Sequence, residues 1–234
     1  PNLPGLLDVP VRAALAERLG RPVVVDNDAN CAAWAEVRLG AAASARDAVV
    51  VTLGTGIGAG LGVGGELRRG AHGFAGEAGH MVVDPDGPPC PCGRRGCWER
   101  YASGSGLGRL ARDLVEAGGA SELLGLAGGD PEAVRGEHVT TAAGHGDPVA
   151  LEVLAQFGRW VALGLVNLTN LLDPDVAVLG GGLVDAGDLL LDPVRRAYHD
   201  LLYGDEHRPP MPILAAHFGA EAGAVGAALL AAGH

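Results

Sequence analysis

Three cysteines lie within eight residues of this chain, in the segment Cys90-Pro91-Cys92-Gly93-Arg94-Arg95-Gly96-Cys97. A disulfide between Cys90 and Cys92 would be badly strained, so the cluster favours a metal over a bridge. Three thiolates leave tetrahedral zinc one ligand short. His80 and His72 are the nearby candidates, and His80 is favoured because it is held before an apolar stretch. We expect a closed, structural zinc site, against the alternative of free thiols, with the ligands His80, Cys90, Cys92 and Cys97.

The fourth cysteine, Cys31, lies on the apolar side of a predicted helix and is expected to be a small core residue.

The zinc loop is flanked by two acidic residues, Glu77 and Glu99. Paired carboxylates beside a small polar pocket suit the binding of neighbouring sugar hydroxyls. Taken singly, each carboxylate fits a solvated surface charge equally well.

The composition excludes several classes of protein. Hydrophobic residues make up 48% of the 234 residues and charged residues 19%, which argues against intrinsic disorder. A net charge of −11 argues against a sequence-independent nucleic-acid binder. All 17 basic residues are arginine, so neither a Gly-Lys-Ser/Thr phosphate loop nor a Schiff-base lysine can exist here. We see no uninterrupted apolar run of membrane-spanning length and no signal segment, and we expect a cytoplasmic protein.

Strands alternate with helices along the chain, which predicts an α/β fold. Long loops are expected over Arg68–Gly79 and Pro85–Arg95 because these segments are rich in glycine, proline and polar residues. Strands are expected at Val23–Val25, Ala48–Leu53 and Val176–Leu179, and helices at Pro10–Leu19, Ala29–Leu39, Gly106–Ala117, Pro131–Arg135, Pro148–Leu172, Leu189–Leu202 and Ala220–Ala232.

A glycine-rich turn, Gly54-Thr55-Gly56-Ile57-Gly58, follows the strand Ala48–Leu53 and leads into another strand. A turn between two strands does not match the dinucleotide-binding fingerprint, in which a helix follows. Its backbone N–H groups can nevertheless form an anion-binding nest, to which Thr55 adds a hydroxyl. Because the chain has no lysine, the charge of a bound phosphate must be balanced by such N–H and hydroxyl groups, by arginine and by a divalent metal. The alternative is a tight hairpin that binds nothing.

Asp28 follows the predicted strand Val23–Val25, where an α/β sheet usually faces its ligand. A carboxylate at this edge could take the proton from a substrate hydroxyl that attacks a phosphoryl group, with Asn27 forming hydrogen bonds beside it. The alternative is that Asp28 only caps the following helix.

Four segments in a fixed order carry a resemblance to a known family: Asn27-Asp28-Ala29-Asn30, Gly54-Thr55-Gly56-Ile57-Gly58, Glu77-Ala78-Gly79-His80 and Cys90-x-Cys92-Gly93-x-x-Gly96-Cys97-x-Glu99. Together they resemble the ROK family of repressors, open reading frames and sugar kinases, and within it the bacterial glucokinases. The resemblance covers nearly the whole chain. It implies a two-domain α/β sugar kinase of the actin-like ATPase (ribonuclease H-like) fold, with ATP in the cleft.

The resemblance also implies roles for single residues. Asp28 corresponds to the catalytic base, and structural Zn²⁺ would be held by the ligands named above. The hexose ligands would be Asn27, Asp28, Glu77, His80 and Glu99, and the ATP-binding residues Gly54, Thr55, Gly56, Gly58, Gly180, Gly181 and Gly182.

The implied reaction is phosphorylation of a hexose at its 6-hydroxyl by ATP with Mg²⁺, with glucose as the favoured substrate. Kinases for N-acetylglucosamine, N-acetylmannosamine, mannose and fructose share the motifs and remain alternatives. So does a sugar-sensing repressor, which carries a helix-turn-helix ahead of a kinase-like part. A purely structural zinc domain is a third alternative. A homodimer or a dimer of dimers is expected, with no nucleic-acid or membrane partner for the kinase.

One departure concerns the family's first phosphate loop, Asp-x-Gly-Gly-Thr, which these 234 residues lack. We therefore expect residues 1–28 to be the remnant of an incomplete small domain, residues 29–219 to form the large domain with the zinc loop, and residues 220–234 to be a helix that returns to the small domain. The prediction of activity applies to the complete polypeptide rather than to these residues alone.

Overall fold

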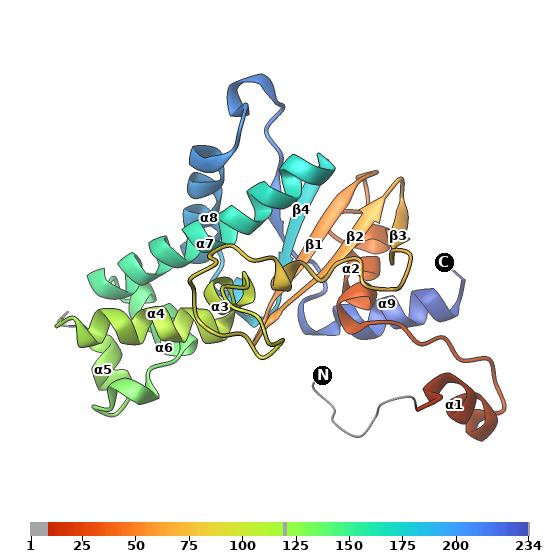
Figure 1. The fold of residues 1–234 in the computed structure, drawn as a ribbon, viewed down its shortest axis with the longest axis horizontal. Coiled ribbons are helices and arrows are strands. Elements are labelled where there is room, and N and C mark those ends of the chain that lie inside the picture. Colours follow the sequence, from red (N-terminus) through yellow and green to blue (C-terminus); the bar gives the residue numbers. More distant parts are fainter. Residues whose placement is uncertain (1–8, 119–120, 234) are drawn as a thin grey trace.

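The computed structural model describes residues 9–118 and 121–233. Its centre is a mixed five-stranded sheet with the order β3-β2-β1-β4-β5 (Figure 1). β1 pairs with β2 and β2 with β3 in antiparallel fashion, whereas β1, β4 and β5 run parallel. The strands are β1 Ala48–Leu53, β2 Ile57–Val63, β3 Glu66–Arg68, β4 Val176–Gly180 and β5 Ile213–Ala215.

The central strand β1 faces a separate core on each side of the sheet. Val49, Val51 and Leu53 point into one core, and Ala48 and Val50 point into the other, as the two-residue period of a strand requires. Strands buried on both faces are expected to be almost continuously apolar. β4 meets this description, since it is buried at every position.

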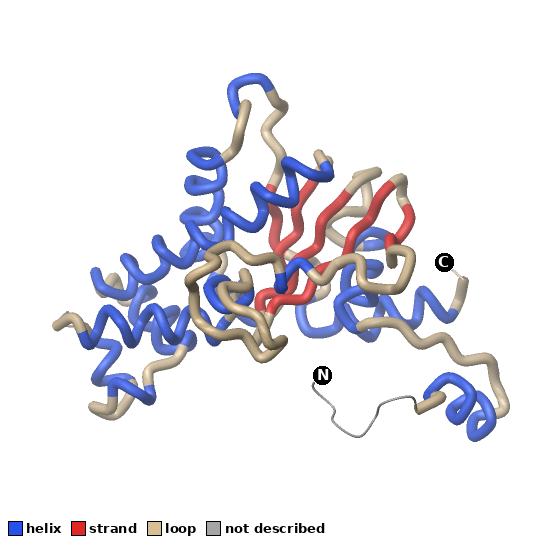
Figure 2. Tube along the Cα trace, viewed as in Figure 1, coloured by secondary structure: helices blue, strands red, loops and turns tan. Residues whose placement is uncertain are grey.

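Helices cover both faces of the sheet (Figures 1 and 2). On one face α2 (Asp28–Leu39) packs against α9 (Ala222–Ala231), and Gly226 allows this close approach because a side chain there would overlap the carbonyl of Cys31. Cys31 is buried, which confirms its prediction as a core residue. The other face carries α3 Glu99–Ala102, α4 Gly104–Glu116, α7 Pro148–Leu172 and α8 Asp188–Leu201.

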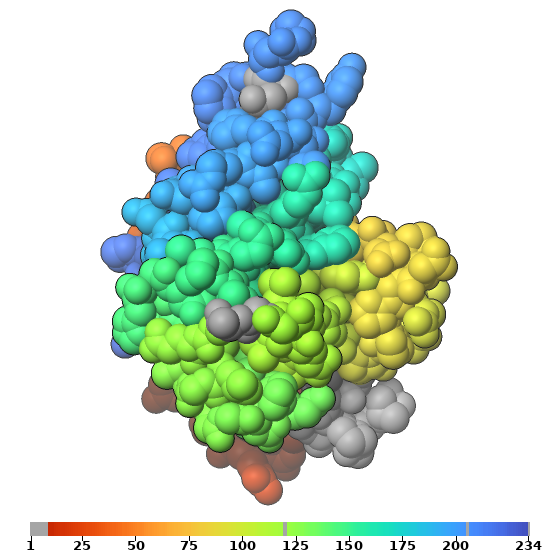
Figure 3. Space-filling view, turned by 90° about the vertical axis from the view of Figure 1, so that its left-hand side faces the viewer, coloured from red at the N-terminus to blue at the C-terminus, as the bar shows by residue number. Residues whose placement is uncertain are grey.

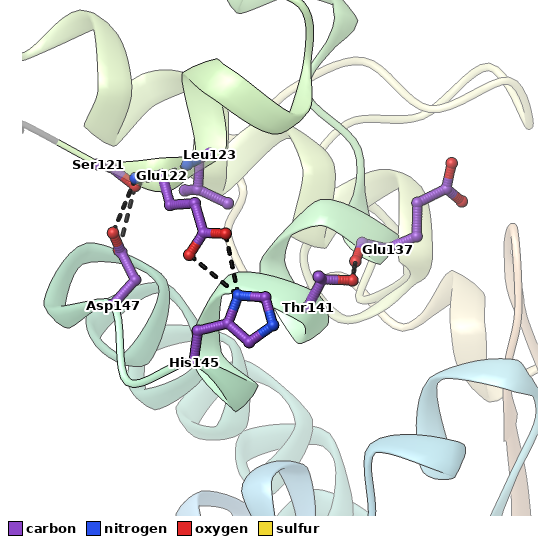
Figure 4. A network of polar contacts seen from close by, with 7 residues as sticks. All are labelled: Ser121, Glu122, Leu123, Glu137, Thr141, His145 and Asp147. Atoms are coloured by element: carbon purple, nitrogen blue, oxygen red, sulfur yellow. Dashed lines mark hydrogen bonds and ion pairs between the residues drawn. The ribbon is translucent and has the colours of Figure 1, made fainter.

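A group of short helices extends this second core away from the sheet. α5 (Glu122–Leu126) and α6 (Gly136–Gly144) are joined to the start of α7 by polar contacts, in which Asp147 accepts hydrogen bonds from Ser121 and Glu122 (Figure 4). His145 lies 2.9 Å from the carboxylate of Glu122. The same network therefore fixes three helices relative to one another.

The longest helix, α7, corrects the expectation that no segment is long and apolar enough to cross a membrane. By length and composition its 25 residues pass that test. Its central residues, among them Phe157, Val161 and Leu165, are nevertheless buried among the other helices of this face. α7 is thus accounted for as a core helix.

The element predictions are confirmed for the long helices and for β1, β2 and β4, but the predicted strand at Val23–Val25 is wrong. No strand in the part of the chain that the structure describes pairs with it, and a strand needs a partner for its backbone groups. Helix α1 (Val11–Leu19) forms without a single buried residue. Pro131–Arg135 is reduced to a short 3₁₀ turn, Pro131–Ala133. The elements β3, β5, α3, α5 and α6 were not predicted. The division into domains remains a prediction.

Candidate active site and metal centre

The predicted zinc ligands come together in space. The sulfur atoms of Cys92 and Cys97 are 3.6 Å apart, Sγ of Cys90 is 3.9 Å from Nδ1 of His80, and all four ligand atoms lie within 4.8 Å of one another. Zinc with Zn–S bonds of about 2.3 Å in a tetrahedron requires sulfur atoms roughly 3.8 Å apart. The donor set and its spacing therefore fit a closed zinc site. His72, the other candidate, is exposed and lies outside this cluster.

The thiols of the cluster differ in their affinity for protons. Burial raises the pKa of Cys97 to about 12 and also raises the pKa of Cys90. The backbone N–H of Arg94 lowers the pKa of the exposed Cys92. Since a metal binds thiolates, its binding must displace protons from the two buried thiols, and the affinity of the site for metal should fall as the pH falls.

The loop that carries the cysteines is held against the core on the α7 side of the sheet. Gly96 adopts φ +63° against the carbonyl of Asp84, where a side chain would overlap that carbonyl. The hydroxyl of Tyr101 donates to the Asp84 carboxylate at 2.5 Å, and its ring stacks on Trp160. The indole N–H of Trp98 donates to the Trp160 carbonyl at 2.7 Å. The loop is thereby held on α7, and its residues form part of the projecting yellow lobe in Figure 3.

Glu99 lies between the metal cluster and the glycine-rich turn. One carboxylate oxygen accepts the backbone N–H of Ile57 at 3.1 Å, and the other lies 3.8 Å from Sγ of Cys90. A side chain at Gly56 would overlap this carboxylate, so any larger residue there must displace Glu99. Glu99 thus connects the two predicted ligand-binding segments.

His80 ends a 3₁₀ turn, Ala78–His80, that lies along β2. Gly79 packs against the carbonyl of Ile57 with no space for a Cβ. Nδ1 of His80 faces the cluster, and Nε2 lies 3.9 Å from a carboxylate oxygen of Glu77. This distance is too long for a hydrogen bond, so the Glu77 carboxylate does not fix the ring of His80.

Asp28 is the first residue of α2, and Asn27 rather than Asp28 caps that helix. The side chain of Asn27 accepts the N–H of Asn30 at 3.1 Å. The alternative role for Asp28 as the cap is therefore wrong. Its exposed carboxylate accepts only the adjacent N–H of Ala29 among the hydrogen bonds of the described residues.

The surroundings of Asp28 differ from those expected, because Val23–Val25 is not a strand. Asp28 borders a cavity of about 240 Å³ together with Thr52, Gly180 and Gly181. Thr52 and Gly180 are register partners near the carboxyl ends of the parallel strands β1 and β4. Asp28 thus lies beside the carboxyl ends of β1 and β4 and not at the end of a strand Val23–Val25, and its ligand-facing role stays a prediction.

The glycine-rich turn after β1 and a second glycine-rich turn at the end of β4, Gly180-Gly181-Gly182, converge on a larger cavity of about 960 Å³. Gly54 and Thr55 line it from one side, and Gly182 lines it from the other. The remaining glycines predicted to bind ATP lie elsewhere. Gly180 and Gly181 border the smaller cavity with Asp28, whereas Gly56 packs against Glu99 and Gly58 against Ala29.

Contacts from α4 hold the first turn in place. The N–H of Gly104 donates to the Gly54 carbonyl at 2.7 Å, and the hydroxyl of Ser105 donates to the Thr55 carbonyl at 2.9 Å. The N-termini of α4 and α6 both border the large cavity, and helix N-termini favour anions. Sequence reasoning missed the lining residues Ser105, Arg112, Arg135, Gly136, Thr140 and Thr141. Ser103, the cap of α4 ahead of a Gly-Ser-Gly run, was the available signal.

The Asp28 side and the metal-cluster side meet at the first residues of β2. Ala29, next to Asp28, packs on Gly58, so closely that a Cβ on Gly58 would lie 2.8 Å from its methyl group. Glu99 and Gly79 contact the neighbouring Ile57. Ile57 and Gly58, at the start of β2, therefore join the acidic group, the glycine-rich turn and the metal cluster.

Comparison with known proteins assigns this arrangement to a family. The sequence pattern of the ROK family matches residues 1–234. The chain belongs to the ROK family. A glucokinase of Streptomyces coelicolor is 46% identical over 224 residues, which cover 95% of this chain and 71% of that protein.

One solved structure and one transcriptional repressor are also similar to this chain. The crystal structure of a ROK family glucokinase from Streptomyces griseus in complex with glucose and AMPPNP has a TM-score of 0.89 and 46% identity, covering 96% of this chain and 73% of that one. A xylose repressor of Bacillus subtilis is 31% identical over 84% of this ROK chain and 47% of its own length. The predicted α/β, actin-like sugar kinase fold is thus confirmed.

Proposed function

We propose that this ROK protein is an ATP-dependent hexokinase that phosphorylates the 6-hydroxyl of glucose. The observation that carries the proposal is the convergence of two glycine-rich turns on one large cavity, with Asp28 beside the same pair of strands. Its similarity to two Streptomyces glucokinases, one bound to glucose and AMPPNP, supports this substrate pair.

Asp28 acts as the general base. Its carboxylate accepts the proton of the 6-hydroxyl while that oxygen forms a bond to the γ-phosphorus and the bond from this phosphorus to the bridging oxygen breaks. The carboxylate is exposed and keeps lone pairs free because Asn27 caps the helix in its place. Bound Mg²⁺ would neutralise charge that develops on the phosphates.

ATP occupies the larger cavity. Thr55 and Gly182 approach its phosphates through backbone N–H groups, whereas the N–H of Gly54 already donates to the Gly56 carbonyl and keeps the turn in shape. Arg112 and Arg135 supply positive charge at the same cavity. Gly56, Gly58, Gly180 and Gly181 act indirectly by keeping the turns in shape, because side chains or backbone already occupy the space beside most of them.

The hexose lies on the metal-cluster side, held by Asn27, Glu77, His80 and Glu99. His80 ligates structural zinc through Nδ1 together with the three cysteines, so its Nε2 is aimed by the metal. The donor set fits this ion, and its role is to keep Glu99 and His80 in place. We further propose that the protein is cytoplasmic and forms a homodimer.

A coupled assay of ATP consumption tests the proposal, with glucose, mannose, fructose, N-acetylglucosamine and N-acetylmannosamine as substrates. The assay uses the natural polypeptide. We expect turnover with glucose to exceed turnover with the other sugars. Sugar binding without ATP consumption for every sugar would instead support a sugar-sensing regulator, the alternative that the similarity to xylose repressors favours.

A further inference from the structure

An ion pair outside the predicted site joins its two halves. Nε and Nη2 of Arg69 lie 2.7 and 2.6 Å from the same carboxylate oxygen of Asp26, a residue 43 positions away in sequence. The Asp26 side chain is only 8% exposed, whereas that of Arg69 is 44% exposed. Neither residue belongs to the motifs of the sequence analysis.

The second oxygen of Asp26 fixes the start of α2. It accepts the backbone N–H of Asn27 at 2.8 Å and the side-chain NH₂ of Asn30 at 3.0 Å. Because a carboxylate can only accept, the amide of Asn30 has a single possible orientation, which leaves its own oxygen without a partner. Asp26 thus determines the position of the residues on either side of Asp28.

Arg69 fixes the start of the loop that leads to Glu77. It follows β3 directly, and its carbonyl accepts the N–H of Ala75 at 3.1 Å, which closes the loop on itself. One residue therefore holds the loop through its backbone and α2 through its side chain. Burial raises the pKa of Asp26, but hydrogen bonds from Asn30, Arg69 and Asn27, and the charge of Arg69, outweigh it, and the pKa lies below its ordinary value.

We infer that Asp26 and Arg69 are a positioning pair that holds Asp28 in register with the hexose-binding loop of Glu77 and His80. The inference rests on the proposed function. An ion pair with one exposed partner adds little to global stability. Displacement of a base by about 1 Å, however, can cost on the order of 10² in rate. The pair should therefore matter more for catalysis than for folding.

The first test compares Arg69→Met with Arg68→Met, in which the neighbouring exposed arginine loses the same charge. In the natural polypeptide we expect Arg69→Met to lower kcat roughly 10- to 100-fold and to raise KM for the hexose, with KM for ATP and the melting temperature close to those of Arg68→Met. Arg69→Lys should retain part of the kcat that Arg69→Met loses. In a variant that already carries Asp26→Asn, adding Arg69→Met should lower kcat little further. A kcat equal to that of Arg68→Met would overturn the inference. So would a loss of kcat that comes with a melting temperature well below that of Arg68→Met, because it would indicate loss of folded protein.

The second test does not depend on hexokinase activity. Hydrogen exchange of the amides of Asn30 and Ala75, which lie on opposite sides of the ion pair, should speed up together in Arg69→Met and stay unchanged in Arg68→Met. If both amides exchange faster in Arg69→Met but the protein phosphorylates no hexose, the positioning pair is supported and the proposed function is refuted. Unchanged exchange at both amides would refute the pair, whatever the activity.

Discussion

Gly56 shows how a single residue constrains the site. A Cβ at this position would overlap the carboxylate of Glu99, which is bonded to the N–H of Ile57. Gly56→Ala must therefore displace either the turn or Glu99. We expect KM for ATP and for the hexose each to rise at least about 10-fold, since a loss of roughly 1.4 kcal/mol of binding has that effect.

Steady-state kinetics with each substrate varied in turn would measure this. The matched control is Gly125→Ala on α5, where a Cβ meets open space and a helix gains from alanine. Equal kinetics for the two variants would show that the contact between Gly56 and Glu99 has no part in binding.

At the residue scale, the sequence predicted ligands that share one short motif better than contacts between distant segments. The cluster of His80 and three cysteines is confirmed. The three cysteines share one short motif, which limits their geometry, and His80 was added from a neighbouring motif. The sequence left the capping role of Asp28 open as an alternative, since Asn27 and Asp28 are both good caps and only the backbone decides between them. The bond from Ile57 to Glu99 spans 42 residues, and no local pattern signals it.

At the scale of elements, Asp147 holds the start of α7 and links it to α5 (Figure 4). Its carboxylate accepts the N–H groups of Ala150 and Glu122, each at 2.8 Å, and the hydroxyl of Ser121. Asp147→Ala should lower the free energy of unfolding by about 1–2 kcal/mol, the usual value of a lost N-cap. Urea denaturation would measure it, with the exposed Glu116→Gln on α4 as the control.

The same residue gives a pH dependence of stability. Burial raises the pKa of Asp147, but hydrogen bonds from Glu122, Ala150, Ser121 and Val149 outweigh it and hold the pKa below its ordinary value. The stabilisation is therefore complete above the unfolded value of about 3.9 and is lost as the pH falls through the lower folded value. The difference in stability between the wild type and Asp147→Ala should shrink in that range. A difference that stays constant down to pH 2 would contradict this.

Elements were predictable where they are long and strongly patterned. α7 was predicted with its observed bounds, because Asp147-Pro148 marks a helix start and the apolar repeat continues for 25 residues. β3 and β5 are three residues long, and α5 is five, so they carry too little pattern to detect. Val23–Val25 has strand composition, but a strand also depends on a neighbour that no local sequence reveals.

At the scale of the molecule, the proposed zinc connects loop order, stability and hexose binding. The purified protein should contain one zinc per chain. Cys92→Ser or a chelator should lower the melting temperature and raise KM for the hexose more than KM for ATP, because Glu99 and His80 lose their anchor. Cys31→Ala, which removes a core thiol outside the cluster, should retain the metal. Elemental analysis that finds no zinc would contradict the proposed metal site.

The account depends on Asp28 as the base that accepts the hydroxyl proton, at the smaller cavity beside β1 and β4. The most direct test measures kcat and the Kd for glucose side by side in the wild type and in Asp28→Asn, using the natural polypeptide. Asparagine keeps the size of the side chain and one acceptor oxygen, but its NH₂ group cannot take a proton. We predict a loss of about 10²–10⁴ in kcat with a nearly unchanged Kd. Turnover equal to that of the wild type in Asp28→Asn would contradict the account.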